Sequence, residues 1–143
     1  MHLNIERYAE TFKLIGKLEL ALREQVVTTL SSLALEKGYS TWRSVLPPLI
    51  IKRSASHEIK LGFVRQLLSQ KYFTELWVPA THSIFSGLPN ASSLKSCQMV
   101  GNRLHYANQT RNRVCHFIFD NIHNVEHEEA NLEWLLNALG ERY

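Results

Sequence analysis

Apolar residues recur at steps of three and four over the first 35 positions of the chain. This period places them on one face of an α-helix. It predicts one long amphipathic helix from Ile5 to about Leu35, and Gly38 stands where a left-handed residue would cap its end. At 1.5 Å per residue the helix is about 45 Å long, so other elements must cover its apolar face. The apolar positions are Ile5, Tyr8, Phe12, Ile15, Leu22, Val26, Leu30 and Leu33.

The next segment carries short helical signals. Residues from Thr41 to Pro48 predict a brief helical turn, which the proline pair at its end stops. Further on, Ser54-Ala55-Ser56 offers an N-cap, and we expect a helix to start near His57.

A second amphipathic region follows between residues 61 and 77. Its spacing is helical, but Ser69-Gln70 interrupts it and Pro79 ends it. A short segment through Ile84 and Phe85 then leads to a loop at Gly87-Leu88-Pro89-Asn90. The apolar positions of the region are Leu61, Val64, Leu67, Leu68, Tyr72, Phe73, Leu76 and Trp77.

Two more helices are predicted in the last third of the chain. Ser92 or Ser93 can cap the first of them, which can continue past Phe117. Residues 120–124 break the pattern, and the acidic residues that follow favour the start of a last helix. The apolar set of the first is Leu94, Cys97, Leu104, Val114 and Ile118, and that of the second is Leu132, Leu135, Leu136 and Leu139.

These elements predict an all-α bundle with a long N-terminal helix, formed by one domain over residues 1–143. Signals for β-strands are nearly absent. No apolar run approaches the roughly 18 residues that cross a bilayer, and the first residues lack the order of a signal peptide. We therefore expect a cytoplasmic protein that does not enter a membrane. Cys97 and Cys115 fit no metal-binding spacing, so neither metal nor cofactor is predicted.

The net charge of +3 hides an uneven distribution along the chain. Residues 1–59 carry +2, residues 60–119 carry +6 with seven Lys/Arg against one Glu, and residues 120–143 carry −5. A basic segment attracts phosphate groups, which makes a nucleic acid a candidate partner.

Candidate chemistry lies in the basic segment, at Thr110-Arg111-Asn112-Arg113-Val114-Cys115-His116. An imidazole exchanges protons near neutral pH, and a guanidinium holds a phosphate through two parallel hydrogen bonds. Arg111 and His116 are five positions apart, which places them about 140° apart around a helix. We therefore expect the helix to distort here, or the cleft to be shared with another element or a second subunit.

The run Arg111-Asn112-Arg113-Val114-Cys115-His116 resembles the R-N-x-x-x-H form of the HEPN superfamily motif. The stretch from Leu67 to Pro79 is similar to the helix that precedes this motif in Abi-like (abortive infection) members, and the long N-terminal helix looks like theirs. The resemblance extends from about Glu6 to Leu139.

This resemblance implies a HEPN-like helical bundle that forms a homodimer and cleaves RNA without metal, as a toxin or phage-defence protein. Arg111 matches the motif arginine, Asn112 the polar residue after it, and His116 the motif histidine. His116 would then activate a ribose 2′-hydroxyl or protonate the leaving oxygen, yielding a 2′,3′-cyclic phosphate. Arg113 is a further candidate for binding nucleic acid because it is close by. Such a nuclease implies an antitoxin protein or a latent state.

The chain departs from some family members. Ile118 stands where one subgroup has a tyrosine, so modification of that tyrosine is not expected. Phe117 replaces a second histidine of Abi-like proteins, leaving His116 as the local acid or base.

Other interpretations of the same residues stay open. The region could belong to a non-catalytic helical module that binds RNA or another protein, with Arg111 and His116 in structural roles. His123-Asn124-Val125-Glu126-His127 matches the H-x-x-E-H zinc pattern, although the start of an acidic helix accounts for the same residues. The tryptophans and phenylalanines at helical spacing are predicted to be core residues rather than platforms for bases.

Overall fold

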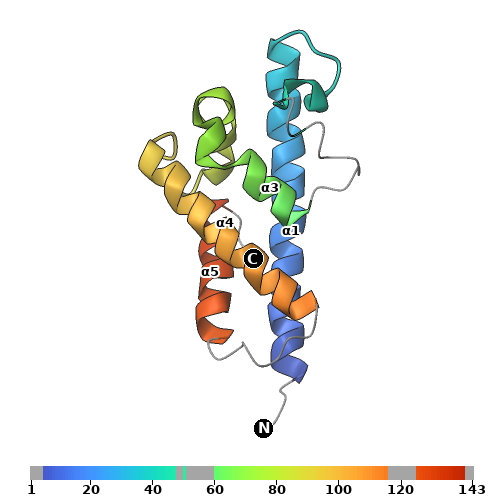
Figure 1. Cartoon of the computed structure of the whole chain (residues 1–143), viewed down its shortest axis with the longest axis vertical. Helices are drawn as coiled ribbons and strands as arrows, with labels where there is room; N and C mark the ends of the chain where they lie inside the picture. The colour runs from blue at the N-terminus through green and yellow to red at the C-terminus, as the bar shows by residue number, and fades with distance from the viewer. Residues whose placement is uncertain (1–4, 48–49, 51–59, 116–124, 141–143) are drawn as a thin grey trace.

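The computed structural model describes residues 5–47, 50, 60–115 and 125–140. Within these ranges every regular element is helical, which confirms the all-α class (Figure 1). None of the helices in these ranges is long and apolar enough to span a membrane. The elements are α1 (Ile5–Glu36), η1 (Trp42–Val45), α3 (Leu61–Leu67), η2 (Gln70–Tyr72), η3 (Phe73–Trp77), η4 (Thr81–Phe85), α4 (Leu94–Cys115) and α5 (Val125–Ala138).

Helix α1 runs along the long axis of the molecule, and its predicted end is confirmed (Figure 1). Gly38 adopts φ +78°, and the Tyr39 amide donates to the Ala34 carbonyl at 2.8 Å. A left-handed glycine after the last turn lets the chain reverse while the final carbonyls stay hydrogen-bonded.

The buried face of α1 differs at two places from the predicted one. Phe12, expected in the apolar stripe and the core, is 56% exposed, so this prediction is wrong. Thr11 is buried beside it and donates a hydrogen bond to Glu129 of α5 at 3.2 Å. Leu18 is fully buried and fills the gap that the pattern left between Ile15 and Leu22. The face toward α5 therefore begins with a polar contact where periodicity indicated an aromatic one.

Helices α1, α4 and α5 pack on one another, and α4 crosses the other two obliquely (Figure 1). The buried positions of α4 form one stripe at steps of three and four, and α5 contributes a leucine stripe. Leu94, which the sequence placed in the apolar set of α4, is 42% exposed. The largest fully buried side chains include Leu18, Leu22, Leu30, Leu104 and Leu132.

The region between residues 60 and 91 covers one side of the bundle. The predicted N-cap at Ser54-Ala55-Ser56 and the helix start near His57 lie outside the described residues. Within them, Lys60 is extended (φ −94°, ψ 163°) and α3 begins at Leu61. The predicted interruption is confirmed at Ser69, which is also extended. The chain then forms a 3-10 turn and one π-helical turn, in which the Val78 amide donates to the Phe73 carbonyl at 2.9 Å.

Aromatic packing anchors this region to the core. Trp77 is buried, stacks on Phe85 with ring centroids 5.6 Å apart, and donates from Nε1 to the Ala91 carbonyl at 2.9 Å. Trp42 and Trp134 are half-buried against the core. Trp77 and Phe85 thus confirm the prediction that these rings serve packing.

The end of α5 docks on the loop after η4 through backbone contact. The Gly87 amide donates to the Ala138 carbonyl at 2.9 Å, and a Cβ at Gly87 would lie 2.2 Å from the Asn137 oxygen. Gly140 adopts φ +74° and ends the helix as Gly38 ends α1. The approach of two backbones therefore requires glycine at position 87.

Candidate functional site

Helix α4 carries the candidate motif, and its charge is of one sign. Over its 22 residues it has Lys95 and three arginines but no Asp or Glu. Its start is one of the two predicted caps, since the Ser96 amide donates to Ser93 Oγ at 3.1 Å. A helix of this composition offers cations along its length, so any carboxylate partner must come from another element.

Arg111 finds such a partner on α1. Its Nε donates to Glu19 Oε1 at 2.7 Å, and the two side chains remain 28% and 19% exposed. Neither terminal amino group of Arg111 hydrogen-bonds to another described residue. The carboxylate therefore fixes the guanidinium from its Nε side, and among the described residues nothing occupies the terminal edge, which is the edge that binds anions.

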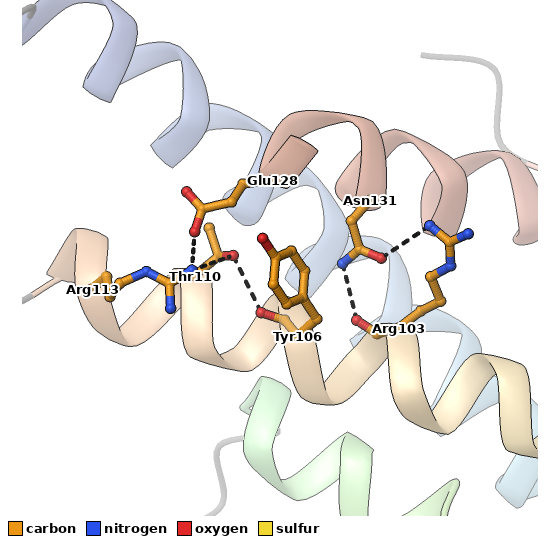
Figure 2. Close-up of polar contacts among 6 residues, drawn as sticks. All are labelled: Arg103, Tyr106, Thr110, Arg113, Glu128 and Asn131. Carbon is orange, nitrogen blue, oxygen red and sulfur yellow. Dashed lines mark hydrogen bonds and ion pairs between the residues drawn. The ribbon is translucent and has the colours of Figure 1, made fainter. Parts of the chain in front are cut away.

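Arg113 lies on the other side of α4 and pairs with Glu128 of α5 (Figure 2). Glu128 is buried, and Arg113 also donates to Thr110 Oγ1 at 3.4 Å. Arg113 Nε and Glu128 Oε2 are buried with no partner among the described residues. These are the two atoms that a side-on bidentate pair would join in addition to the contact present.

A second polar link between α4 and α5 lies farther along the same seam (Figure 2). Asn131 accepts a hydrogen bond from Arg103 Nη1 at 3.4 Å and donates to the Arg103 carbonyl at 3.0 Å. The Arg103 guanidinium also covers the Trp134 ring, 4.7 Å from its centroid. Arg103 is thereby committed to packing α5 against α4.

Tyr8 of α1 has a phenol whose pKa depends on burial and on the nearby charge of Arg113. Burial raises the pKa of its phenol, and the positive charge of Arg113 opposes that rise without cancelling it. The phenol is therefore neutral at physiological pH and cannot serve as a base there.

The structure thus separates the predicted site residues. Arg111 points to α1 with its terminal edge open, Asn112 is exposed between the two arginines in sequence, and Arg113 is engaged by Glu128. His116 lies outside the described residues, so its position relative to Arg111 stays a prediction. His123 of the H-x-x-E-H pattern also lies outside them.

Metal binding has no support in the described ranges. No group of three or more His, Cys, Asp or Glu side chains is arranged there to hold an ion.

Sequence reasoning missed Glu19 and Glu128 as partners of the two arginines. The acidic start of α5 was predicted and is confirmed, since Glu126 and Glu128 lie in its first turn. Nothing local indicates Glu19, which is 92 positions from Arg111 and is one of several acids on α1. The absence of any acid from α4 was the available signal that its arginines are paired by other helices.

We compared the chain with protein families, curated proteins and solved structures. No family model matches the chain, and neither does any curated protein or solved structure.

Proposed function

We propose that this protein is a metal-independent endoribonuclease of the toxin or phage-defence type, acting through Arg111, Asn112 and His116. The observation that carries the proposal is the state of Arg111. Glu19 holds its Nε, its terminal amino groups make no contact with other described residues, and over a quarter of the side chain is exposed. A guanidinium oriented in this way is suited to bind a phosphate with its free edge.

The charge of the surrounding helix supports the same substrate class. α4 has four cations and no carboxylate of its own, and this excess of positive charge attracts the phosphates of a nucleic acid. Asn112 is exposed next to Arg111 and supplies an amide that can both donate and accept hydrogen bonds. Arg113 has no part in this proposal, because Glu128 already holds it.

The proposed reaction uses the RNA's own nucleophile. His116 takes the proton of a ribose 2′-hydroxyl, whose oxygen attacks the adjacent phosphorus while Arg111 stabilises the developing charge. The bond from phosphorus to the 5′-oxygen breaks, and that oxygen receives a proton from an imidazolium. The products are a 2′,3′-cyclic phosphate and a 5′-hydroxyl, and DNA is spared because it lacks the 2′-hydroxyl.

The separation of Arg111 and His116 in sequence favours a dimeric site. Five positions apart on a regular helix, they would diverge by about 140°. A second copy would bring its own histidine to the cleft and supply acid and base together. A homodimer in the cytoplasm, held inactive by an antitoxin until needed, completes the proposal.

The alternative is a non-catalytic module that binds RNA or a protein, and one observation favours it. Arg111 and Arg113 both bind carboxylates of other helices. Arg111 binds Glu19 of α1, and Arg113 binds Glu128 of α5. Ion pairs that tie α4 to its neighbours are also what a purely structural role requires.

Incubation with cellular RNA in EDTA separates the two functions. We expect the protein to release fragments with 2′,3′-cyclic phosphate ends, and His116→Ala to slow cleavage by at least about 100-fold. His127→Ala, which removes an exposed histidine of α5, is the control and should cleave normally. Full activity of His116→Ala, or cleavage of RNA with a 2′-deoxy sugar at the scissile position, would refute the mechanism. Intact RNA with retained binding would favour the alternative.

A further inference from the structure

A polar hollow lies between α3, η2 and α4, away from Arg111. Its volume is about 470 Å³, within the range of ligand sites in proteins. Among the described residues that line it there is a guanidinium, an imidazole, a hydroxyl and several amides, but no carboxylate. These residues include Arg65, Ser69, Gln70, Gln98, Asn102 and His105.

Arg65 differs from the arginines of α4 because no described residue is its partner. Glu19, Glu128 and Asn131 engage Arg111, Arg113 and Arg103, whereas Arg65 makes no hydrogen bond or ion pair within the described part of the chain. A partly buried cation in a hollow whose described lining has no carboxylate favours an external anion.

The hollow is continuous with an exposed polar stripe along α4. The stripe advances by four and three residues alternately, so its members share one face of the helix. All of them are exposed amide or imidazole side chains, able to contact phosphates and base edges. They are Gln98, Asn102, His105, Gln109 and Asn112.

The stripe leads from the hollow to the candidate cleavage motif. From Gln98 to Asn112 the helix rises about 21 Å, which a stacked strand covers with about six nucleotides at ~3.4 Å each. Asn112 is next to Arg111, the residue whose terminal edge is open. A strand following the stripe would therefore place one phosphate at Arg65 and a later one at Arg111.

We propose that the hollow around Arg65 binds a phosphate of single-stranded RNA about six nucleotides from the bond cleaved, with the stripe on α4 as the path between them. The RNA assignment rests on the proposed function. The site itself rests on three observations: Arg65 has no partner among the described residues, the described lining of the hollow has no carboxylate, and the stripe continues from the hollow along α4.

The test measures binding of a fluorescein-labelled 12-nucleotide single-stranded RNA to the His116→Ala chain, so that cleavage plays no part. We expect Arg65→Ala to weaken binding about tenfold in 50 mM salt and to reduce the slope of log K against log salt by about 0.7. Arg65→Lys should bind RNA with an affinity between those of the parent and of Arg65→Ala, because lysine keeps the positive charge but cannot form two parallel hydrogen bonds. Lys37→Ala, an exposed cation beyond the end of α1, is the charge-matched control and should bind like the parent.

Equal effects of Arg65→Ala and Lys37→Ala would overturn the site, as would weaker binding with an unchanged salt slope. If Arg65→Ala does not fold, judged by its circular dichroism, Gln98→Glu decides instead. It puts a carboxylate at an exposed lining position and should weaken binding about tenfold, and unaltered binding would overturn the proposal. Displacement of the RNA by poly-glutamate as readily as by unlabelled RNA would assign the hollow to an acidic protein.

The outcomes for site and function remain distinct. If the wild-type chain fails to cleave RNA while Arg65→Ala still weakens binding, the nuclease is refuted and the site is kept. If the wild-type chain cleaves RNA while Arg65→Ala binds normally, the nuclease is kept and the site is refuted.

Discussion

Arg111 and Glu19 lie 92 positions apart in the chain, yet 2.7 Å separates the arginine Nε from the glutamate Oε1. This bond connects the end of α4 to the middle of α1 and sets the direction in which the guanidinium faces. Because the pair is partly exposed, we expect its loss to change the orientation of Arg111 more than the free energy of unfolding.

Removal of Glu19 should slow the reaction more than it weakens substrate binding. In Glu19→Ala, Arg111 keeps its charge but loses the group that holds it, so we expect RNA cleavage to show a kcat reduced about ten- to hundredfold with KM unchanged or lower. The free energy of unfolding should fall by no more than about 1 kcal/mol, because the pair is partly exposed. Glu24→Ala, an exposed acid on the same helix, is the control. Equal kcat values for the two variants would remove Glu19 from the site.

The Arg113–Glu128 pair should behave as a buried ion pair. Arg113→Ala or Glu128→Ala alone leaves an unpaired charge inside the bundle, and we expect each to lower the free energy of unfolding by about 2–4 kcal/mol in urea denaturation. The double variant Arg113→Met with Glu128→Leu should be more stable than either single one, because apolar side chains of similar size replace both charges. Additive losses in the double variant would show that the two residues act independently.

The two cysteines should differ in reactivity. Cys97 is buried and its burial raises the pKa of the thiol to about 11, whereas Cys115 is exposed. At pH 8 only about one Cys97 thiol in a thousand is ionised, and that fraction rises tenfold with each pH unit toward 11. We expect iodoacetamide to modify the folded protein once, at Cys115, as read by mass spectrometry. Cys115→Ser should abolish labelling until urea unfolds the chain. Rapid labelling of folded Cys115→Ser would place Cys97 at the surface.

Two glycines should respond oppositely to alanine. A Cβ at Gly87 would lie 2.2 Å from the Asn137 carbonyl oxygen, so Gly87→Ala must push the loop from the end of α5 and should cost about 1–3 kcal/mol. Gly16 lies inside α1 with nothing within 4 Å of such an atom, so Gly16→Ala should stabilise the protein by about 0.5–1 kcal/mol. Thermal melting measures both. A lower melting temperature for Gly16→Ala would contradict the packing described for α1.

The sequence predicted the long helices and the end of α1 well because these features depend on nearby residues, whereas the predicted continuation of α4 past Phe117 lies outside the described residues. The cap at Gly38, the break at Ser69 and the acidic start of α5 all follow from local backbone chemistry. Phe12 shows the limit of this reasoning. A pattern identifies an apolar residue near the right face, but which side chain enters the core depends on where α5 lies, and there the partner of Thr11 is Glu129.

The candidate site was predictable in composition but not in pairing. The sequence places Arg111, Asn112 and Arg113 together, while the structure assigns the arginines to different neighbours, α1 and α5. Such pairs depend on how helices cross, and no spacing within α4 contains that information. The π-helical turn at Phe73–Trp77 was missed for a related reason, since one additional residue per turn leaves the apolar pattern helical.

The position of each residue around the axis of α4 limits where the chain can gain or lose residues. One helix presents its core stripe, its contacts with α1 and α5, and its exposed stripe, and each depends on the same rotation per residue. A deletion of one residue between Leu104 and Ala107 would turn everything after it by about 100°. Val114 would leave the core, and both arginines would leave their glutamates at once. Viable variants are therefore expected to gain or lose residues only in the segments between helices, so that the interior and the motif are preserved or lost together.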